Sequence, residues 1–178
     1  MRLLRRFGRV RATFDDAFRT AARVFPELAQ LGVPTQIFVC TQYARDGAPL
    51  TIPELAGDDP AELATMTWDE LRAHGDAGVA IGSHGVSHAH LTRLGDAEVR
   101  AELVESKREL EDQLGRPCTD FAYPYGEHDE RVHRLVRAAR YERAYGLREG
   151  GRNPYALRRV DLYRRHGPVR ALLRLAPW

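Results

Sequence analysis

Cysteine, lysine and long apolar runs are all scarce in this sequence of 178 residues. Its two cysteines, Cys40 and Cys118, form neither a disulfide framework nor a Cys-x-x-Cys metal pair. No apolar run approaches the roughly 20 residues that span a bilayer. The opening segment, MRLLRRFGRVR, carries charge without the apolar stretch of a signal peptide. We therefore expect a cytoplasmic protein, or one peripheral at the inner face of the membrane.

Disorder is excluded by the composition, because 43% of the residues are hydrophobic, an ordinary share for a globular protein. The length suits one domain that buries a single core without disulfide or metal cross-links. We accordingly treat residues 1–178 as one domain, in which residues 148–178 form an arginine-rich tail.

Basic charge is concentrated toward the C-terminus. Residues 131–178 hold 13 basic and 3 acidic side chains, whereas residues 1–130 hold 14 basic and 22 acidic ones. An arginine-rich region can face the phosphates of a lipid head group or of a nucleic acid, although a solvated surface is more common. The region lacks interleaved aromatic residues, so we do not expect a nucleic-acid partner. Peripheral membrane contact through the last segment, GPVRALLRLAPW, stays open as an alternative to packing on the domain.

Short apolar runs alternate with helical periods along the chain. Strands are predicted at residues 10–14, 35–40, 79–81, 121–123, 144–147 and 157–163. Helices are predicted in a stretch ending at residue 32 and at residues 68–77, 97–114 and 132–139. This order predicts an α/β fold with a parallel sheet and right-handed crossovers, either open or closed into a barrel.

Two of the predicted helices carry clear end signals. Thr67 and Glu70 have the spacing of a capping box at the start of one. Asp96 is expected to cap the start of the longest helix, and Gly115 to end it. Residues 43–66, rich in glycine, proline and aspartate, are predicted as a long irregular loop of the kind that often serves function.

Polar residues gather where the predicted strands end, the edge at which parallel α/β sheets place their chemistry. Asp15 and Asp16 follow the first strand, and His84 and His88 follow the third. One turn of helix would put both imidazoles on the same side. Two histidines and one carboxylate can hold a divalent cation with positions left open for water and substrate.

Adjacent carboxylates at a strand end can take different tasks. One of Asp15 and Asp16 can turn to the cation while the other acts as general base toward a water. Each fragment also has a plainer interpretation. An Asp-Asp pair is usually a turn or a helix cap, a lone His-x-x-x-His is commonly surface or core, and YPYG is a proline turn. Their coincidence on successive strand ends favours the metal site.

In this order the motifs resemble those of the polysaccharide deacetylases, the NodB-homology domain of carbohydrate esterase family four. TFDD at residues 13–16 is similar to the first motif, residues 84–88 to the second, and FAYPYG at residues 121–126 to the third. The resemblance covers roughly residues 9–147. It implies a distorted (β/α) barrel of about seven parallel strands that can be incomplete at its ends. It also implies metal-dependent removal of an acetyl group from an N-acetylated sugar or polysaccharide, with lipid-linked sugars among the candidates.

The resemblance further implies a role for each motif residue. The metal, Zn²⁺ first with Co²⁺ or Ni²⁺ as alternatives, would be held by Asp16, His84 and His88. Asp15 would be the catalytic base. Tyr125 would offer its backbone N–H to the oxyanion, and Pro124 would lie beside it in the substrate site.

Four features depart from the family pattern. Ala17 follows the two aspartates where glycine is usual, and Gly85 stands where serine or threonine is common. Ala122 replaces an arginine that braces the base. The sequence lacks the late Leu-x-His motif that supplies a general acid, and neither His128 nor His166 is assigned that role. These departures leave two alternatives, a carbohydrate-binding relative without turnover and a hydrolase of another small linear amide.

Overall fold

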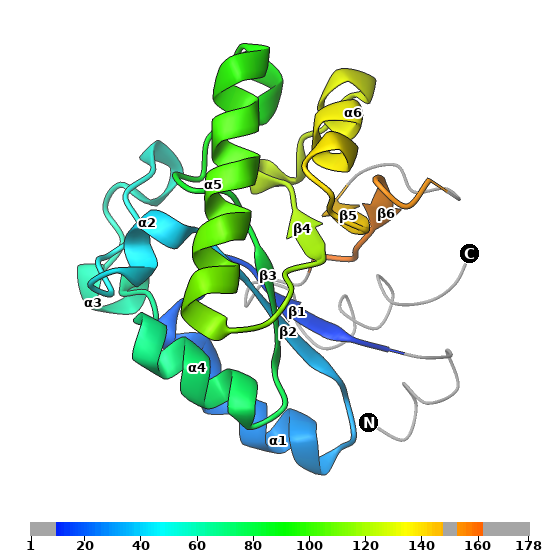
Figure 1. Ribbon diagram of the computed structural model, residues 1–178. Helices are drawn as coiled ribbons and strands as arrows, with labels where there is room; N and C mark the ends of the chain where they lie inside the picture. The colour runs from blue at the N-terminus through cyan, green and yellow to red at the C-terminus, as the bar shows by residue number, and fades with distance from the viewer. Residues whose placement is uncertain (1–9, 148–152, 162–178) are drawn as a thin grey trace.

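The computed structural model describes residues 10–147 and 153–161, which contain one sheet of six parallel strands. The strands are β1 (Ala12–Phe14), β2 (Thr35–Val39), β3 (Ala80–Ser83), β4 (Asp120–Ala122), β5 (Arg143–Gly146) and β6 (Leu157–Arg158). Consecutive strands are neighbours throughout the sheet. The sheet curls into a half-barrel (Figure 1), as predicted, with one strand fewer in the described residues than the resemblance implies.

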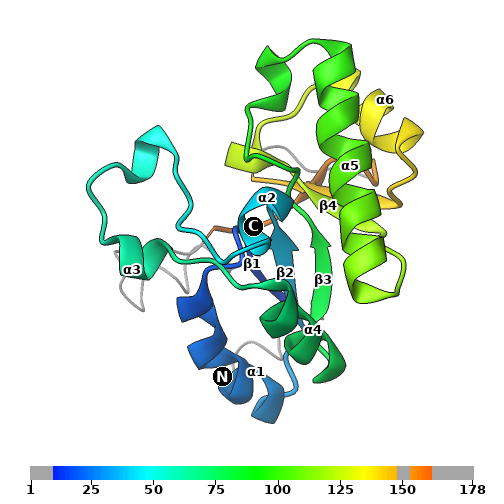
Figure 2. The same cartoon turned by 60° about the vertical axis from the view of Figure 1, so that its left-hand side comes forward.

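Helices on the outside of the curled sheet connect the strands (Figures 1 and 2). They are α1 (Phe25–Gln30), α2 (Thr41–Ala44), α3 (Pro60–Leu63), α4 (Trp68–Asp76), α5 (Asp96–Leu114) and α6 (Glu130–Ala138). Short 3₁₀ helices lie at Arg19–Val24, Pro53–Leu55, Leu91–Arg93 and Pro124–Gly126. Helix α5, the longest, packs against α4, α6 and β3.

Helix boundaries largely follow the predicted signals. The capping box of α4 is present, with the Glu70 N–H donating to Thr67 Oγ1 and the Thr67 N–H donating to the Glu70 carboxylate at 2.8 Å. Helix α5 ends at Gly115 in the left-handed conformation, as expected. Its predicted N-cap is wrong, because Asp96 is already helical and Gly95 is the cap, with its N–H donating to the Glu98 carboxylate.

Residues 43–66 are more regular than predicted. They include α3 and a 3₁₀ turn, and two isolated antiparallel bridges tie the segment to itself and to the chain after β1. The reason is a small apolar cluster in which Cys40, Tyr43 and Leu50 are buried together. The Thr65 hydroxyl donates to the Tyr43 carbonyl at 3.1 Å and closes the segment at its far end.

The half-barrel holds a polar cluster near the start of β4. Asp120 is buried, and its carboxylate accepts hydrogen bonds from Gln36 Nε2 at 3.0 Å, Arg143 Nε at 2.8 Å and Tyr145 Oη at 3.3 Å. Gln36 lies on β2, whereas Arg143 and Tyr145 lie on β5, the neighbour of β4. The cluster therefore joins strands across the interior, at the end opposite to the polar residues that follow β1 and β3.

No helix in the described ranges is long and apolar enough to cross a bilayer. The segment GPVRALLRLAPW and His166, which bear on the alternative of peripheral membrane contact, lie outside the described residues.

Candidate metal and catalytic site

The polar residues predicted at strand ends do meet at one edge of the sheet. Asp15 and Asp16 directly follow β1, and His84 directly follows β3. Strand β2 lies between β1 and β3 and pairs with both in parallel, so the carboxyl ends of all three strands share one edge.

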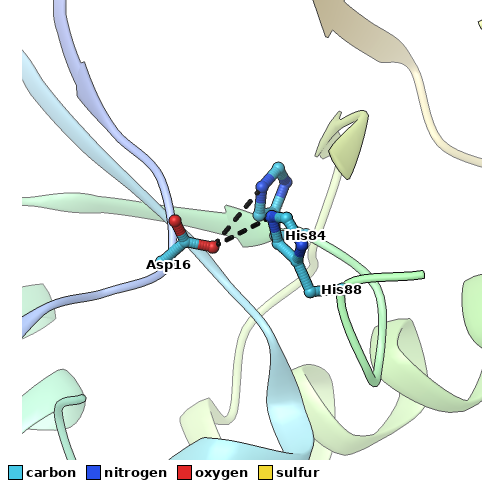
Figure 3. A group of neighbouring side chains, drawn as sticks. All are labelled: Asp16, His84 and His88. Carbon is cyan, nitrogen blue, oxygen red and sulfur yellow. Dashed lines mark ion pairs between the residues drawn. The ribbon is translucent and has the colours of Figure 1, made fainter. Parts of the chain in front are cut away.

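Three side chains converge there on a single point (Figure 3). Asp16 Oδ1 lies 3.3 Å from His88 Nε2 and 3.7 Å from His84 Nε2. One ligand atom from each residue lies within 4.8 Å of the others. Both histidines are buried, at 1% exposure for His84 and 6% for His88.

The group fits a divalent cation. Asp16 Oδ1 is buried without a hydrogen-bond partner, which is costly for a carboxylate unless a cation satisfies it. His84 Nδ1 donates to the Ala122 carbonyl at 2.7 Å, so its Nε2 keeps a lone pair for the site. One carboxylate and two imidazoles form a ligand set that Zn²⁺ accepts with a position left open.

Burial shifts the pKa values of Asp16 and His88 in opposite directions. It raises the pKa of Asp16 to about 6 and lowers the pKa of His88 to about 3. The imidazole of His88 is therefore neutral near pH 7, the form that binds a metal. A nearby dication would favour the charged form of Asp16 and reverse its shift.

Asp15 is held by an arginine instead. Arg159 donates from its two terminal nitrogens to the two carboxylate oxygens, at 2.6 Å and 2.8 Å. The Arg159 guanidinium also lies 5.2 Å from the centre of the Phe38 ring, inside the half-barrel. Burial alone would raise the pKa of Asp15, but Arg159 and the nearby histidines outweigh it and lower the pKa below its ordinary value. Asp15 is thus ionised beside Asp16, and the two adjacent carboxylates have different environments.

Comparison with known proteins agrees with this arrangement. Residues 6–144 match the sequence profile of the family described as polysaccharide deacetylase. The chain belongs to the polysaccharide deacetylase family. The predicted resemblance is therefore confirmed at the level of the family and, with the half-barrel, of the fold.

Individual relatives are distant. The Bacillus subtilis (strain 168) protein YxkH, which carries the family's name, is 22% identical over 153 residues that cover 83% of this chain and 49% of YxkH. The chain thus spans about half the length of this curated relative. The Streptococcus pyogenes deacetylase PplD, solved in complex with acetate, superposes with a TM-score of 0.76 at 21% identity, covering 94% of this chain and 70% of PplD. IcaB from Ammonifex degensii superposes with a TM-score of 0.73 at 20% identity, covering 94% of this chain and 73% of IcaB.

Arg159 is the residue that sequence reasoning missed. The family pattern suggests an arginine at position 122, where this deacetylase-family chain has a buried alanine whose carbonyl orients His84. Arg159 directly follows β6 and supplies a guanidinium to Asp15 from the far side of the half-barrel. The signal available in the sequence was the alanine at position 122, which implies that the arginine beside Asp15 comes from another position.

The backbone around the site is unusual. Non-glycine residues adopt left-handed conformations at Asp16 (φ 65°), Ala17 (φ 53°), His88 (φ 62°) and Tyr125 (φ 59°). Such conformations cost L-residues roughly 1–2 kcal/mol each, so packing must hold them. Ala17 takes the left-handed conformation that the family's glycine would favour, although it carries a buried methyl group.

The expected helical turn between His84 and His88 is wrong. The segment is a non-helical turn in which Gly85 (φ 86°) and His88 are left-handed. The two rings still meet, with their centroids 5.0 Å apart. The non-helical turn therefore brings the two imidazoles as close together as predicted, without a turn of helix.

Tyr125 lies next to the ligand group of Asp16, His84 and His88. Its ring stacks on His90 with centroids 3.6 Å apart and meets the His88 ring edge-on at 4.5 Å. The Tyr125 hydroxyl donates to Glu54 at 3.5 Å, and burial together with Glu54 raises its pKa to about 12. Pro124, at the first position of the same 3₁₀ turn, is buried. His90 therefore belongs to the wall of the site.

His128 has a different setting. It shares a 2.9 Å hydrogen bond with His133, and its ring lies 5.0 Å from that of Tyr123. The three-residue ligand group formed by the described residues does not include it. His133 is only 7% exposed because α6 turns it toward the sheet.

Proposed function

We propose that this protein is a metal-dependent hydrolase that removes the acetyl group from an N-acetylated sugar or polysaccharide. One observation carries the proposal, the convergence of Asp16, His84 and His88 beside the arginine-held Asp15. Membership of the polysaccharide deacetylase family supports it.

Each residue has a task in this reaction. A divalent cation held by Asp16, His84 and His88, Zn²⁺ first with Co²⁺ or Ni²⁺ as alternatives, would polarise the acetyl carbonyl and lower the pKa of water. Asp15 accepts a proton from the attacking water, and Arg159 keeps that carboxylate oriented and ionised. The backbone N–H of Tyr125 donates to the oxyanion, with Pro124 beside it against the substrate.

The bonds and protons balance. The water oxygen bonds to the acetyl carbon as Asp15 takes one proton, the C–N bond then breaks, and acetate leaves. The amine nitrogen gains one proton, which equals the proton that Asp15 accepted. The second proton of the water stays on the acid oxygen and is lost to solvent as the acid ionises to acetate. The ionised state of Asp15 before each turnover is the condition that Arg159 maintains.

The substrate class rests on relatives. PplD is described as a deacetylase in complex with acetate, and acetate is the acid released in the proposed reaction. YxkH carries the name of polysaccharide deacetylases. Since this chain spans about half of YxkH, the particular sugar and the N- or O-linkage are left to experiment.

The test is release of acetate from N-acetylglucosamine oligomers by zinc-loaded protein. We expect Asp15→Asn to lower the rate by about 100-fold or more, the typical contribution of a general base. Asp112→Asn, at an exposed aspartate of α5, is the matched control and should keep the wild-type rate. Oligomer binding without acetate release would favour the carbohydrate-binding alternative. Turnover restricted to small linear amides would favour the other hydrolase.

Peripheral membrane contact is a separate proposal, supported only by the arginine-rich composition of the tail and its apolar, arginine-bearing last segment. Flotation with liposomes containing anionic lipid tests it, by comparing the full chain with a chain that ends at residue 166. Equal flotation of both would exclude a role for GPVRALLRLAPW.

A further inference from the structure

A glutamate on α5 reaches the turn that carries the two histidines. One carboxylate oxygen of Glu102 accepts the backbone N–H of Val86 at 2.7 Å and that of Ser87 at 3.1 Å. The other oxygen accepts the Ser87 hydroxyl. All three donors come from the segment between His84 and His88. Glu102 therefore holds the centre of that segment by three contacts.

The left-handed backbone of this turn requires hydrogen-bond partners from outside the sheet. Gly85 and His88 are both left-handed, so the N–H groups between them leave the pattern of the sheet. On the other side, the carbonyls of Gly85 and Val86 accept the first N–H groups of α2, at 3.1 Å and 3.2 Å. Helix α2 thus satisfies the carbonyls of Gly85 and Val86, and Glu102 satisfies the N–H groups of Val86 and Ser87.

Glycine at position 85 is favoured by the left-handed backbone (φ 86°) and by the closeness of the same carboxylate. A Cβ atom at Gly85 would lie 2.8 Å from Glu102 Oε2, too close for an undisturbed contact. The side chain that is common in the family at this place would therefore displace Glu102 or be displaced by it. In this chain Ser87 supplies a hydroxyl to the turn instead, and that hydroxyl is bound to Glu102.

We propose that Glu102 is a positioning residue that sets the metal affinity of the site by fixing where the turn places His88. The inference rests on the proposed metal-dependent function, and it adds a residue that does not itself belong to the ligand group. Loss of the carboxylate would free the turn and let the left-handed His88 relax away from Asp16. Outer-shell residues of metal sites typically contribute 10–100-fold in affinity.

The experiment measures Co²⁺ and Zn²⁺ dissociation constants of metal-free protein by competition with a chelating dye. We expect Glu102→Ala to weaken binding by about 10–100-fold. Glu102→Gln retains an oxygen for the two backbone N–H groups and should stay close to wild type. Glu105→Ala, at an exposed glutamate on the same helix, is the matched control and should not change the constants.

Two further readouts separate positioning from general stability. The visible spectrum of the Co²⁺ protein should change in Glu102→Ala, because the geometry around the ion changes. Ser87→Ala removes one contact without altering the helix, and an intermediate loss of affinity is expected. If Glu102→Ala does not fold, Ser87→Ala decides, and wild-type constants for it would overturn the inference.

Failure of this inference differs from failure of the proposed function. Wild-type affinity and spectrum in folded Glu102→Ala would overturn the positioning role alone. Absence of metal binding by the wild type and by Glu105→Ala would overturn the metal-dependent function and the inference with it.

Discussion

Arg159 donates hydrogen bonds to both carboxylate oxygens of Asp15, which lies 144 residues earlier in the sequence. The family pattern has an arginine at the position of Ala122, on β4, whereas the guanidinium here enters from the end of β6. The side chain of Arg159 is only 9% exposed, whereas that of Asp15 is 31% exposed, so the guanidinium is shielded from solvent while the carboxylate stays accessible. The same charge thus reaches the base from a different strand.

The first prediction concerns this pair. Arg159→Met should lower the rate of acetate release by roughly 100-fold, the scale of a misplaced reacting group, because Asp15 loses its orientation. Zinc content should stay at the wild-type level, since Arg159 is not in the ligand group. Arg158→Met, at the exposed neighbouring position, is the control. Loss of zinc in Arg159→Met, or wild-type turnover, would contradict the assigned role.

The second prediction concerns the metal and stability. Zinc at about 100 times its dissociation constant should stabilise the protein by ~2.7 kcal/mol, because it binds only the folded state. For a domain of this size that corresponds to a rise in Tm of about 5–10 °C. His88→Ala should abolish the rise, and a chelator should reverse it in the wild type. Thermal unfolding with and without zinc measures both effects.

The control for that measurement is His74→Ala. His74 lies on α4 against Phe25, with ring centroids 5.1 Å apart, and is not part of the ligand group. It should retain the full zinc-dependent rise in Tm. An equal rise in His88→Ala would show that His88 is not a ligand.

The third prediction separates the ring of Tyr125 from its hydroxyl. Tyr125→Phe should lower kcat/KM by less than about tenfold, because it removes one long hydrogen bond to Glu54 and keeps the backbone N–H. Tyr125→Ala should fall further, since the stacking on His90 is lost. A loss of about 100-fold in Tyr125→Phe would contradict this and assign proton transfer to the hydroxyl. Steady-state kinetics on the same oligomers distinguish the cases.

The fourth prediction concerns the opposite end of the half-barrel. Asp120→Ala should lower the free energy of unfolding by about 2–3 kcal/mol, because Gln36 and Tyr145 lose a buried acceptor while the half-exposed Arg143 can hydrate. Activity well below Tm should not change. Urea unfolding measures the loss, and Asp112→Ala is the exposed control. A change under about 0.5 kcal/mol, the range of ordinary surface substitutions, would contradict a structural role for the cluster.

The ligand group could be predicted from sequence because its information is local. Asp16 follows one apolar run directly, His84 follows another, and parallel strands end at one edge. The strands themselves were recognisable from short apolar runs, although β6 covers only Leu157–Arg158 and residues 159–161 of the predicted strand lie outside it. Its pairing with β5, not its own composition, decides where it ends.

Other parts of the site depend on contacts that a sequence does not display. Arg159 reaches Asp15 only after the sheet has curled, and Glu102 reaches the histidine turn only from a helix packed on β3. The stacking of His90 on Tyr125 follows from the two turns after β3 and β4, in which His88 and Tyr125 are left-handed although neither is glycine. Periodicity reports which face is apolar and carries no information about such turns.

The late position of β6 also bears on synthesis. A ribosome makes Asp16, His84 and His88 well before it makes Arg159. The emerging chain therefore contains Asp15 before it contains the guanidinium that binds it. Domains fold as units while translation proceeds at roughly 5–20 residues per second, which puts several seconds between Tyr125 and Arg159. Because a domain folds as a unit, the pair of Asp15 and Arg159 forms only after β6 has been made. Any step that needs Asp15 held by Arg159 therefore waits until the last described strand has been synthesised.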